Sequence, residues 1–361
     1  MNSKHYEAVV VGAGGVGSAA LLALAQRGLR VLGIDRYAPP HDRGSSHGQT
    51  RIIRQAYFEH PDYVPLVNDA YRRWHALEAV VGRQLFYNCG LLELGPADGV
   101  VVPGVLAAAE QHNLKVERLT PVEIARRWPD FRLSEPVVGV YEPTAGYLDV
   151  EACVACHLQA ATSLGAQLAT NVVVRDWSAG ESVAIQTDKG TIEADRLVVT
   201  AGPWASELLK DLSLQLTVRH KGLVWFRAAE AAKDLPAYLF ELSSGIFYGF
   251  PALADGAMKV AAHSGGVDVV RVLPAASSTP ELEEIVQFTR NHLPTLAGEI
   301  ERSSSCYYTM SPDDHFVLDH WPDEPRVAFC AGLSGHGFKF APTLGHVLAD
   351  LVVDGKTDLP V

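Results

Sequence analysis

Apolar positions along the chain switch between strand-like and helix-like spacing, most clearly near the N-terminus. EAVVV (7–11) is a short β-branched run, SAALLALAQRGL (18–29) carries helix formers, and RVLGID (30–35) is a second apolar run. With the glycine cluster between the first two runs, this order predicts one βαβ unit. An apolar run, a glycine break and a helical stretch return at DRLVVTAGPWASELL (195–209) and RVAFCAGLSGHGFKFAPTLGHVLADLV (326–352).

The pattern between these units predicts further helices and many short strands. Helical spacing is expected at 61–81, 102–113, 151–165 and 281–293. Strands are expected at 86–94, 166–174, 216–228, 245–252, 258–263 and 303–310. Residues 37–51 are rich in Pro, Gly and Ser and are expected to form a long loop that leads into a helix, and loops of this length are usually functional.

The order of these elements predicts an α/β chain of two domains. At 361 residues the chain is long enough for two cores. We expect a discontinuous Rossmann-like domain over 1–85, 145–215 and 315–361. The intervening segments, 86–144 and 216–314, are expected to form an antiparallel-sheet domain for the substrate.

Composition narrows the class of protein. Hydrophobic residues make up 48% and charged residues 20%, which is ordinary for a globular protein. A net charge of -12 without any basic run argues against nucleic-acid binding. No signal peptide or membrane-spanning stretch is expected. The five cysteines are scattered, as in a reducing compartment, so a cytoplasmic protein is the prediction.

The glycine cluster fits the dinucleotide-binding fingerprint G-x-G-x-x-G. Gly12 allows the tight turn, Gly14 allows close approach of a pyrophosphate, and Gly17 lets the helix pack on the strand. Asp35 ends the second strand, where an acid would accept ribose hydroxyls. The alternative is a chance glycine turn, and the fingerprint alone does not separate NAD from FAD.

Five segments occur in order and carry a family resemblance: GSSHGQTRIIRQAY (44–57), GIFYGFP (245–251), MKVAAH (258–263), CYYTMSPDDHFVLD (306–319) and AGLSGHGFKF (331–340). Together they closely resemble the monomeric sarcosine oxidase and N-methyl-L-tryptophan oxidase family, FAD-dependent amine oxidases of the D-amino-acid-oxidase-like superfamily. The late glycine segment also favours FAD, because a nicotinamide dehydrogenase would not need three strand–glycine–helix units at one site.

The resemblance gives Cys306 a role. In this family the matching cysteine forms a thioether to the 8α-methyl group of the flavin, so covalent FAD attachment is expected at Cys306. Without the resemblance, an inert buried thiol would be the natural interpretation. Cys153 and Cys156 form a competing pair, but they lie in an expected helix without His or Cys ligand partners, so we expect no metal site.

The resemblance also implies a set of substrate-binding residues. Arg54 and Lys339 are expected to bind the substrate carboxylate, which needs fixed cations, while Arg51 lies beside the flavin. Lys259 and His263 share one face of a strand because they are four residues apart. The family's lysine favours reaction of reduced flavin with oxygen, and its histidine lines the substrate pocket. From the sequence alone, these would be surface residues.

Other matching positions are expected near the flavin or the substrate. Tyr248 and Tyr308 match pocket tyrosines, although tyrosines are also common in cores. The remaining residues expected to bind FAD, besides those already named, are Arg36, Ser45, His47, Thr50, Gly202, Trp204, Gly335, Gly337, Phe338 and Lys339. Four departures from the family pattern question strict sarcosine specificity: Ser46, Gln49, Leu239 and the bulky segment 57–60.

The predicted function is oxidation of an N-methyl amino acid. Hydride transfer to FAD would give an imine, hydrolysis would give formaldehyde and an amino acid, and O2 would be reduced to H2O2. Two alternatives remain: the same chemistry on N-methyl-tryptophan or a cyclic imino acid, and a flavin dehydrogenase that uses a partner as electron acceptor. The expected partners are a small N-methyl amino acid and O2, with no nucleic acid and no membrane, and a monomer is expected.

Overall fold

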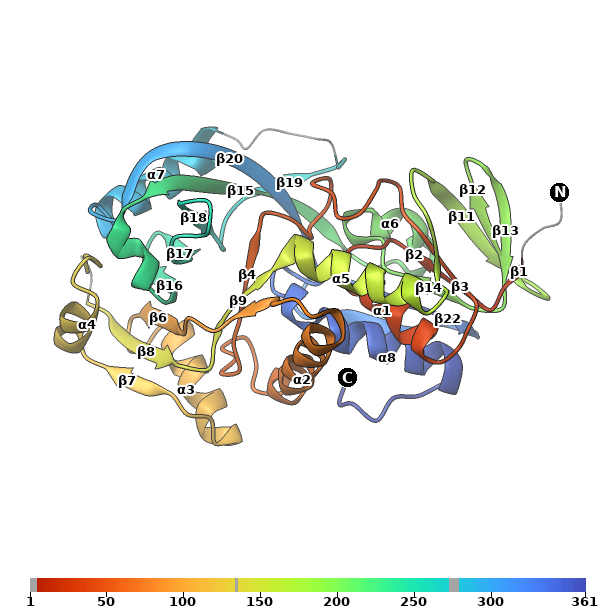
Figure 1. Ribbon diagram of the computed structural model, residues 1–361, viewed down its shortest axis with the longest axis horizontal. Helices are drawn as coiled ribbons and strands as arrows, with labels where there is room; N and C mark the ends of the chain where they lie inside the picture. The colour runs from red at the N-terminus through yellow and green to blue at the C-terminus, as the bar shows by residue number, and fades with distance from the viewer. Residues whose placement is uncertain (1–4, 134–135, 273–278) are drawn as a thin grey trace.

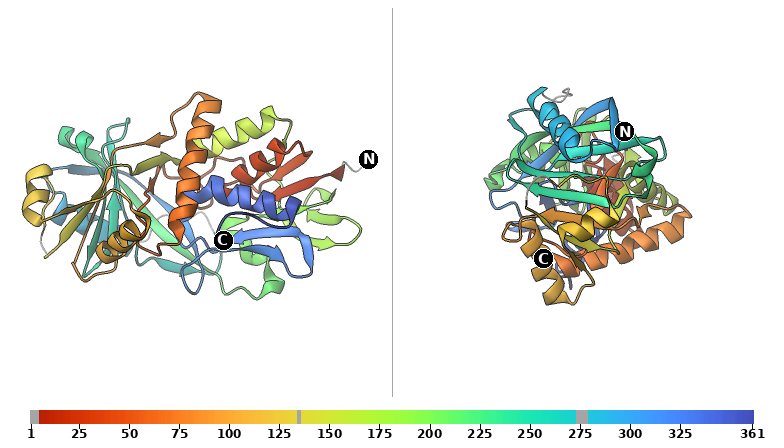
Figure 2. Two further views of the ribbon diagram at one scale, coloured as in Figure 1. Left: turned by 90° about the horizontal axis from the view of Figure 1, so that it is seen from below. Right: turned by 90° about the vertical axis from the view of Figure 1, so that its left-hand side faces the viewer.

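The computed structural model describes residues 5–133, 136–272 and 279–361. Residues 1–4, 134–135 and 273–278, which belong to the predicted domains, lie outside the described residues. The molecule is elongated, with one sheet system toward each end of its long axis (Figures 1 and 2). The predicted α/β class, with a Rossmann-like part and a part rich in antiparallel strands, is confirmed.

A six-stranded sheet forms the half that contains the glycine turn. Its strand order is β10-β3-β2-β14-β22-β21, and only the edge strand β21 runs antiparallel to its neighbour. The strands are β2 (Ala8–Val11), β3 (Val31–Ile34), β10 (Gln167–Ala169), β14 (Leu197–Val199), β21 (Val317–Trp321) and β22 (Glu324–Ala331). The three strand–glycine–helix units of the sequence therefore lie side by side in this sheet.

The alternation of side chains along β2 explains why both faces of the sheet are covered. Ala8 and Val10 face a core shared with four helices, whereas Val9 and Val11 face a core shared with a second, smaller sheet. The helices are α1 (Gly15–Gln26), α2 (Tyr63–Val81), α5 (Val150–Ser163) and α8 (Ala341–Asp354), all labelled in Figure 1.

A four-stranded sheet, order β1-β13-β12-β11, covers the other face. Its strands are β1 (His5–Tyr6), β11 (Val174–Ala179), β12 (Val183–Thr187) and β13 (Gly190–Ala194), and the neighbouring helical turns are η1 (Gly202–Trp204), α6 (Ala205–Leu208) and η2 (Lys210–Leu212). The hairpins of this sheet were not predicted, because their outward side chains are mostly polar and only one face is buried.

A nine-stranded, mostly antiparallel sheet forms the other half of the molecule. Its path is β19-β15-β18-β17-β16-β6-β8-β7, with β20 paired to β15. The strands are β6 (Leu91–Gly95), β7 (Glu117–Leu119), β8 (Val138–Glu142), β15 (Thr217–Ala228), β16 (Ala237–Leu242), β17 (Gly245–Gly249), β18 (Ala257–Ala262), β19 (Val267–Val269) and β20 (Ala297–Met310). Strands β15 and β20 pair along almost their whole length. The strand predicted at 216–228 matches β15, whereas the one predicted at 303–310 covers only the later part of β20.

The two faces of this sheet have different roles. On β18, Met258 and Val260 face a core closed by α7, while Lys259 and Ala261 face the opposite way, toward the six-stranded half. The helices beside the sheet are α3 (Val101–His112), α4 (Pro121–Arg127) and α7 (Thr279–His292), with η3 (Glu230–Asp234) between β15 and β16. The inward face of the sheet is therefore available to form a site.

A small three-stranded sheet lies between the two halves (Figure 1). It consists of β4 (Thr50–Ile53), β5 (Phe86–Tyr87) and β9 (Gly146–Asp149). The sequence predicted a loop running into a helix around Arg51 and Arg54, and this prediction is wrong. The β-branched Ile52 and Ile53 favour a strand, and pairing with β9 fixes it.

Several predicted elements match the structure closely. Helices were expected at 61–81, 102–113, 151–165 and 281–293, and α2, α3, α5 and α7 occupy these stretches. The division of the chain into two domains at the predicted boundaries stays a prediction. Over the residues that are described, no helix combines the length and the hydrophobicity that crossing a membrane requires.

Candidate active site

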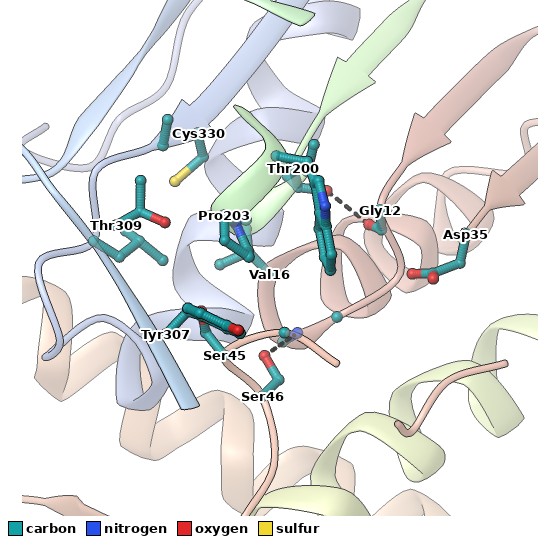
Figure 3. Close-up of a pocket in the computed structure, with 18 of the residues that line it drawn as sticks. Gly12, Val16, Asp35, Ser45, Ser46, Thr200, Pro203, Tyr307, Thr309 and Cys330 are labelled. Atoms are coloured by element: carbon teal, nitrogen blue, oxygen red, sulfur yellow. Dashed lines mark hydrogen bonds between the residues drawn. The ribbon is translucent and has the colours of Figure 1, made fainter. Parts of the chain in front are cut away.

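The glycine turn between β2 and α1 has backbone geometry that only glycine allows. Gly12 has a φ of 89°, and a Cβ there would lie 2.4 Å from the carbonyl oxygen of Thr200. A Cβ on Gly17 would lie 1.7 Å from the carbonyl oxygen of Gly12. The Thr200 hydroxyl donates to the Gly12 carbonyl at 2.8 Å, which Figure 3 shows as a dashed line. The turn is thus held open at the start of a long helix, where N–H groups favour an anion.

Two polar side chains hold this turn. One oxygen of Asp35 accepts from the backbone N–H of Ala13 and the other from that of Tyr37, both at 2.8 Å. The Ser46 hydroxyl accepts from the N–H of Gly15 at 3.0 Å (Figure 3). Since a carboxylate offers about four acceptor sites, Asp35 keeps capacity for ribose hydroxyls. Ser46, a departure from the family pattern, therefore has a structural partner in the turn.

A long cleft of about 1370 Å³ runs from the glycine turn to the start of the nine-stranded sheet. Tyr307 and Thr309 of β20 close the end away from Asp35 (Figure 3). The predicted cofactor residues that line the cleft are Gly12, Gly14, Asp35, Arg36, Ser45, Arg51, Gly202, Trp204, Gly335, Gly337 and Phe338. A turn without side chains, a helix N-terminus and an acid at the second strand fit the pyrophosphate and ribose of FAD.

The other predicted cofactor residues lie beside the cleft rather than in its lining. Gly17 packs α1 against β2, and the carbonyl of Thr50 accepts from Lys259. His47 is buried, and its Nε2 has no hydrogen-bond partner among the described residues. Burial and the nearby charge of Arg51 lower the pKa of His47 to about 4, so its ring is neutral at physiological pH.

A second, smaller pocket of about 510 Å³ adjoins the cleft. Both cavities are lined by Arg51, Tyr308, Gly335 and Phe338, so they meet at these residues. The predicted substrate residues in the pocket lining are Arg54, Tyr248, His263, Tyr308 and Lys339. They come from β17, β18, β20, η4 (Phe338–Phe340) and the end of β4, and the fold brings them together although they are far apart in the sequence.

Arg54 is almost fully buried and surrounded by aromatic rings and carboxylates. Its guanidinium lies 4.4 Å from the ring centres of both Tyr57 and Phe58. Its Nη2 donates to Glu59, and its Nε lies 3.2 Å from Oε1 of Glu93. Burial alone would raise the pKa of Glu59, but Arg54, together with Lys339 and the neighbouring histidines, outweighs it and lowers that pKa to about 2. Arg54 therefore faces the pocket as part of a charge cluster.

Lys339 contributes a second cationic group to the pocket. Its Nζ donates to the carbonyl of His336 at 2.8 Å and to the hydroxyl of Tyr57 at 3.3 Å. Burial, followed by repulsion from Arg54, lowers the pKa of Lys339 to about 7. The protonation state of Lys339 thus depends on what binds beside it, and an anionic ligand would favour the positively charged form.

Lys259 lies on the inward face of β18, and His263 directly follows the end of that strand at Ala262. Lys259 is fully buried, and its Nζ donates to the carbonyls of Gly48 and Thr50 at 2.6 and 2.9 Å. Burial and the charge of Arg51 place the pKa of Lys259 well below its ordinary value. The ring of His263 lies 6.0 Å from that of Tyr308, and burial lowers the pKa of His263 to about 4. Lys259 lines neither cavity. It lies against residues 48–50, which directly precede Arg51, and Arg51 lines both cavities.

Cys306 lies on β20 opposite Lys221 of β15, two residues before Tyr308 and on the same face. Its thiol is buried, and burial raises its pKa although Arg51, Lys259 and Lys221 act in the opposite direction. Cys306 is absent from the described lining of the cleft, whereas Cys330 of β22 is part of it (Figure 3). All five cysteines are free thiols.

The sequence did not identify several residues of the two cavities. In the cleft these include Thr200, Pro203, Tyr307, Thr309 and Leu333, and in the pocket Ile52 and His336. Thr200 directly follows β14, the strand expected from the apolar run in 195–209, and ligands bind at such strand ends, so the position itself was a usable signal. Glu93, behind Arg54, gave no signal, because a lone acid in LLELG resembles the polar position of an exposed strand.

A dinucleotide cleft joined to a small pocket lined by Arg51, Arg54 and Lys339 fits a dinucleotide-dependent oxidoreductase. Residues 7–351 match the DAO family, FAD dependent oxidoreductase. The chain belongs to this family of FAD-dependent oxidoreductases, and the predicted cofactor is confirmed as FAD.

Named relatives cover almost the whole chain. Monomeric sarcosine oxidase of Bacillus sp. (strain B-0618) is 36% identical over 99% of this chain and 94% of its own length. N-methyl-L-tryptophan oxidase of Yersinia pestis (strain Pestoides F) is 38% identical over 99% of this chain and 97% of its own length. The resemblance drawn from the five sequence segments is confirmed, and the chain is an amine-oxidase-type flavoenzyme.

Solved structures agree on the fold. NikD, an amino acid oxidase essential for nikkomycin biosynthesis, superimposes with a TM-score of 0.89 at 26% identity, covering 99% of this chain and 96% of that one. L-proline dehydrogenase from P. horikoshii has a TM-score of 0.86 at 22% identity, with coverage of 99% and 96%. The second similarity bears on the fold alone.

Proposed function

We propose that the protein is an FAD-dependent oxidase of N-methyl amino acids. The observation that carries this proposal is the arrangement of Arg54 and Lys339, which line one small pocket that opens into the FAD cleft. Two buried cations suit a carboxylate. The named relatives act on N-methyl amino acids by their names, sarcosine and N-methyl-L-tryptophan, which supports the same substrate class here.

The pocket would fix the substrate by its carboxylate and enclose the amine. Arg54 and Lys339 bind the carboxylate, and Tyr248, Tyr308 and His263 form walls that exclude water from the reacting carbon. When bound, FAD supplies the redox chemistry by taking two electrons from the substrate and passing them to an acceptor. His263 is neutral at physiological pH because burial lowers its pKa to about 4, so it adds no charge that would repel an ammonium group.

Lys259 is proposed as the group that favours O2 as the electron acceptor. It lies on β18, four residues before His263, and its carbonyl partners Gly48 and Thr50 directly precede Arg51, which lines both cavities. A cationic side chain fixed there stabilises negative charge that develops as oxygen is reduced. Its lowered pKa limits this effect to the protonated fraction of Lys259.

Covalent attachment of FAD through Cys306 is part of the proposal. Cys306 is on the face of β20 that also carries Tyr308, which lines both cavities. Arg51, Lys259 and Lys221 all favour its thiolate, the reactive form. By analogy with the named monomeric relative, the protein is proposed to act as a monomer in the cytoplasm, on a small-molecule substrate and O2.

The residues that line the pocket indicate which kind of substrate side chain it would accept. Phe58 and Leu239 line the pocket together with Ile52 and Tyr248, so the surface beyond the two cations is largely apolar. This favours an N-methyl amino acid with a modest apolar side chain over a polar one. N-methyl-tryptophan and cyclic imino acids remain alternatives that the same walls could hold.

Oxygen uptake with a substrate panel would test the proposal. The purified flavoprotein would be given sarcosine, N-methylalanine, N-methyl-tryptophan, proline and pipecolate, with O2 consumption, H2O2 and formaldehyde measured together. Equal amounts of H2O2 and formaldehyde are expected with N-methyl amino acids. Flavin bleaching without O2 consumption would instead identify a dehydrogenase that needs another acceptor, and no bleaching with any substrate would reject the proposed function.

A further inference from the structure

Glu93 is a fully buried acid for which the proposed chemistry gives no role. It lies on β6, its side chain is 0% exposed, and its Oε1 lies 3.2 Å from Nε of Arg54. Neither of its carboxyl oxygens has a hydrogen-bond partner among the described residues. A buried carboxylate without hydrogen bonds is costly unless a charge stabilises it or a proton neutralises it.

The surroundings of Glu93 do little to stabilise its ionised form. Its neighbours on the adjacent strands are Val140 of β8 and Leu239 of β16, both apolar. The charged groups that act on it are Arg54 and Lys339, which favour ionisation, and Glu142 and Glu59, which oppose it. Glu142 accepts from the backbone N–H groups of Gln55 and Ala56 at 2.8 and 3.0 Å, so its carboxylate is already satisfied.

Arg54 already has one ionised partner, Glu59, on its Nη2. If Glu93 were ionised as well, a substrate carboxylate would be a third negative charge on a single buried guanidinium. Opposite charges interact strongly in such a low-dielectric site, but so do like charges. Burial, despite Arg54, raises the pKa of Glu93 to about 8, so near neutral pH most of the protein holds this acid as the neutral carboxyl.

We propose that Glu93 is a positioning residue that controls carboxylate binding at Arg54: the pocket accepts a carboxylate ligand only with Glu93 protonated. Above about pH 8, the ionised Glu93 must therefore take up one proton from solution when the ligand binds. The carboxylate ligand then replaces Glu93 as the second negative partner of Arg54. The inference rests on the proposed function, because it takes Arg54 as the carboxylate-binding group.

Calorimetry can count that proton. The flavin-loaded enzyme would be titrated with methoxyacetate, an unreactive ether analogue of sarcosine, at about pH 9 in two buffers of different ionisation enthalpy. Lys339, with a pKa of about 7, also takes up a proton on binding an anion. We therefore expect up to two protons per ligand in the wild type and up to one in Glu93→Gln. Each proton that binds with the ligand makes Kd rise by about tenfold per pH unit. Above pH 8, Kd should therefore rise less steeply in Glu93→Gln than in the wild type, by about this factor per pH unit.

Glu59→Gln is the companion variant. It makes the same substitution on the other carboxylate partner of Arg54, but the pKa of Glu59 is about 2, so this acid does not itself titrate in the range tested. Without the charge of Glu59, the ligand and an ionised Glu93 are only two negative partners of Arg54, so Glu93 can stay ionised and proton uptake should also fall by about one. A second variant, Glu93→Met, fills the buried position with a hydrocarbon chain of similar length, and it should lose the same proton as Glu93→Gln.

The outcomes separate the inference from the function it rests on. Loss of about one proton in both Glu93 variants and in Glu59→Gln would support the role of Glu93. Equal uptake in wild type and Glu93 variants would overturn it, and so would unchanged uptake in Glu59→Gln. Failure of the wild type to bind methoxyacetate at about pH 6, where Glu93 is protonated, would reject the carboxylate site itself.

Discussion

The FAD cleft and the substrate pocket adjoin each other but are built on different principles. The cleft starts at a turn of glycines within one βαβ unit, where the backbone itself forms the binding surface. The pocket is made of side chains from several strands and loops, and Arg54 in its lining lies among the buried ionisable groups Glu59, Glu93 and Lys339. FAD binding in the cleft therefore depends on the room that the glycines leave, whereas ligand binding in the pocket depends on a balance of charges.

This difference predicts how each region responds to change. At Gly12 and Gly17 of the turn, an added carbon has no room, because the nearest atom it meets belongs to the backbone. In the pocket, removing one charge alters the protonation of its neighbours, since Arg54, Glu59, Glu93 and Lys339 shift one another's pKa values. Mutations in the cleft should act through FAD affinity, and those in the pocket through substrate affinity and pH dependence.

The largest effect is expected for Arg54→Met. Removing one partner of a buried ion cluster typically costs about 3–5 kcal/mol, so kcat/KM for an N-methyl amino acid should fall by about 1000-fold. Steady-state kinetics with the amino acid and with its carboxamide would check this. If the variant lost as much activity toward the neutral carboxamide, Arg54 would serve the fold rather than carboxylate binding.

Lys259→Met should have the next largest effect, confined to the reaction with oxygen. Loss of a fixed charge at a reacting centre costs about 100-fold or more. Stopped-flow mixing with O2 should show slow recovery of the oxidised flavin spectrum, while anaerobic bleaching by substrate is little changed. Since Lys259 is charged only below its lowered pKa, the wild-type recovery rate should fall as pH rises, and the variant should lose this dependence. Equal slowing of both half-reactions would contradict the assignment.

Gly17→Ala should weaken FAD binding without touching the pocket. Its Cβ would lie 1.7 Å from the carbonyl oxygen of Gly12, so the turn must shift. Overpacking of this kind costs about 1–3 kcal/mol, which corresponds to roughly 10- to 100-fold weaker FAD binding. Flavin retained after gel filtration measures this when the substitution is made in a Cys306→Ala background, where FAD is held without a covalent bond. The matched control is Gly180→Ala, whose Cβ meets nothing closer than 3.8 Å and which should retain FAD fully.

Cys306→Ala should change the covalent state of FAD more than the rate of catalysis. We expect acid precipitation to leave flavin in the pellet of the wild type and none in that of the variant, with kcat changed by less than about tenfold because orientation in the pocket is retained. Cys330→Ala is the matched control, since Cys330 is the buried cysteine in the described cleft lining. Loss of acid-stable flavin in Cys330→Ala alone would move the attachment to Cys330.

The contrast between the two regions also explains what the sequence could predict. Gly12, Gly17 and Asp35 were predictable because their requirements arise within one local unit. Lys259 and His263 were placed on one strand face by their spacing, and the five family segments pointed to Arg54 and Lys339. Each of these signals lies within a short stretch of chain.

The remaining features arise from long-range packing. Nothing near Glu93 in the sequence indicates that β6 lies beside β16 and brings this acid against Arg54. The strand at Thr50–Ile53 depends on pairing with β9, almost a hundred residues away. The hairpins β11 to β13 carry polar outward residues, so their alternation is weak.

The most direct test of the central claim is anaerobic reduction of the bound flavin by a matched pair of amines, an N-methyl amino acid and its N-methyl carboxamide. The arrangement of Arg54 and Lys339 beside the FAD cleft predicts rapid bleaching of the flavin absorbance by the acid. It also predicts bleaching by the carboxamide that is slower by about 100-fold or more, because two buried cations would lack their anionic partner. Equal bleaching by both compounds, or by neither, would contradict the account.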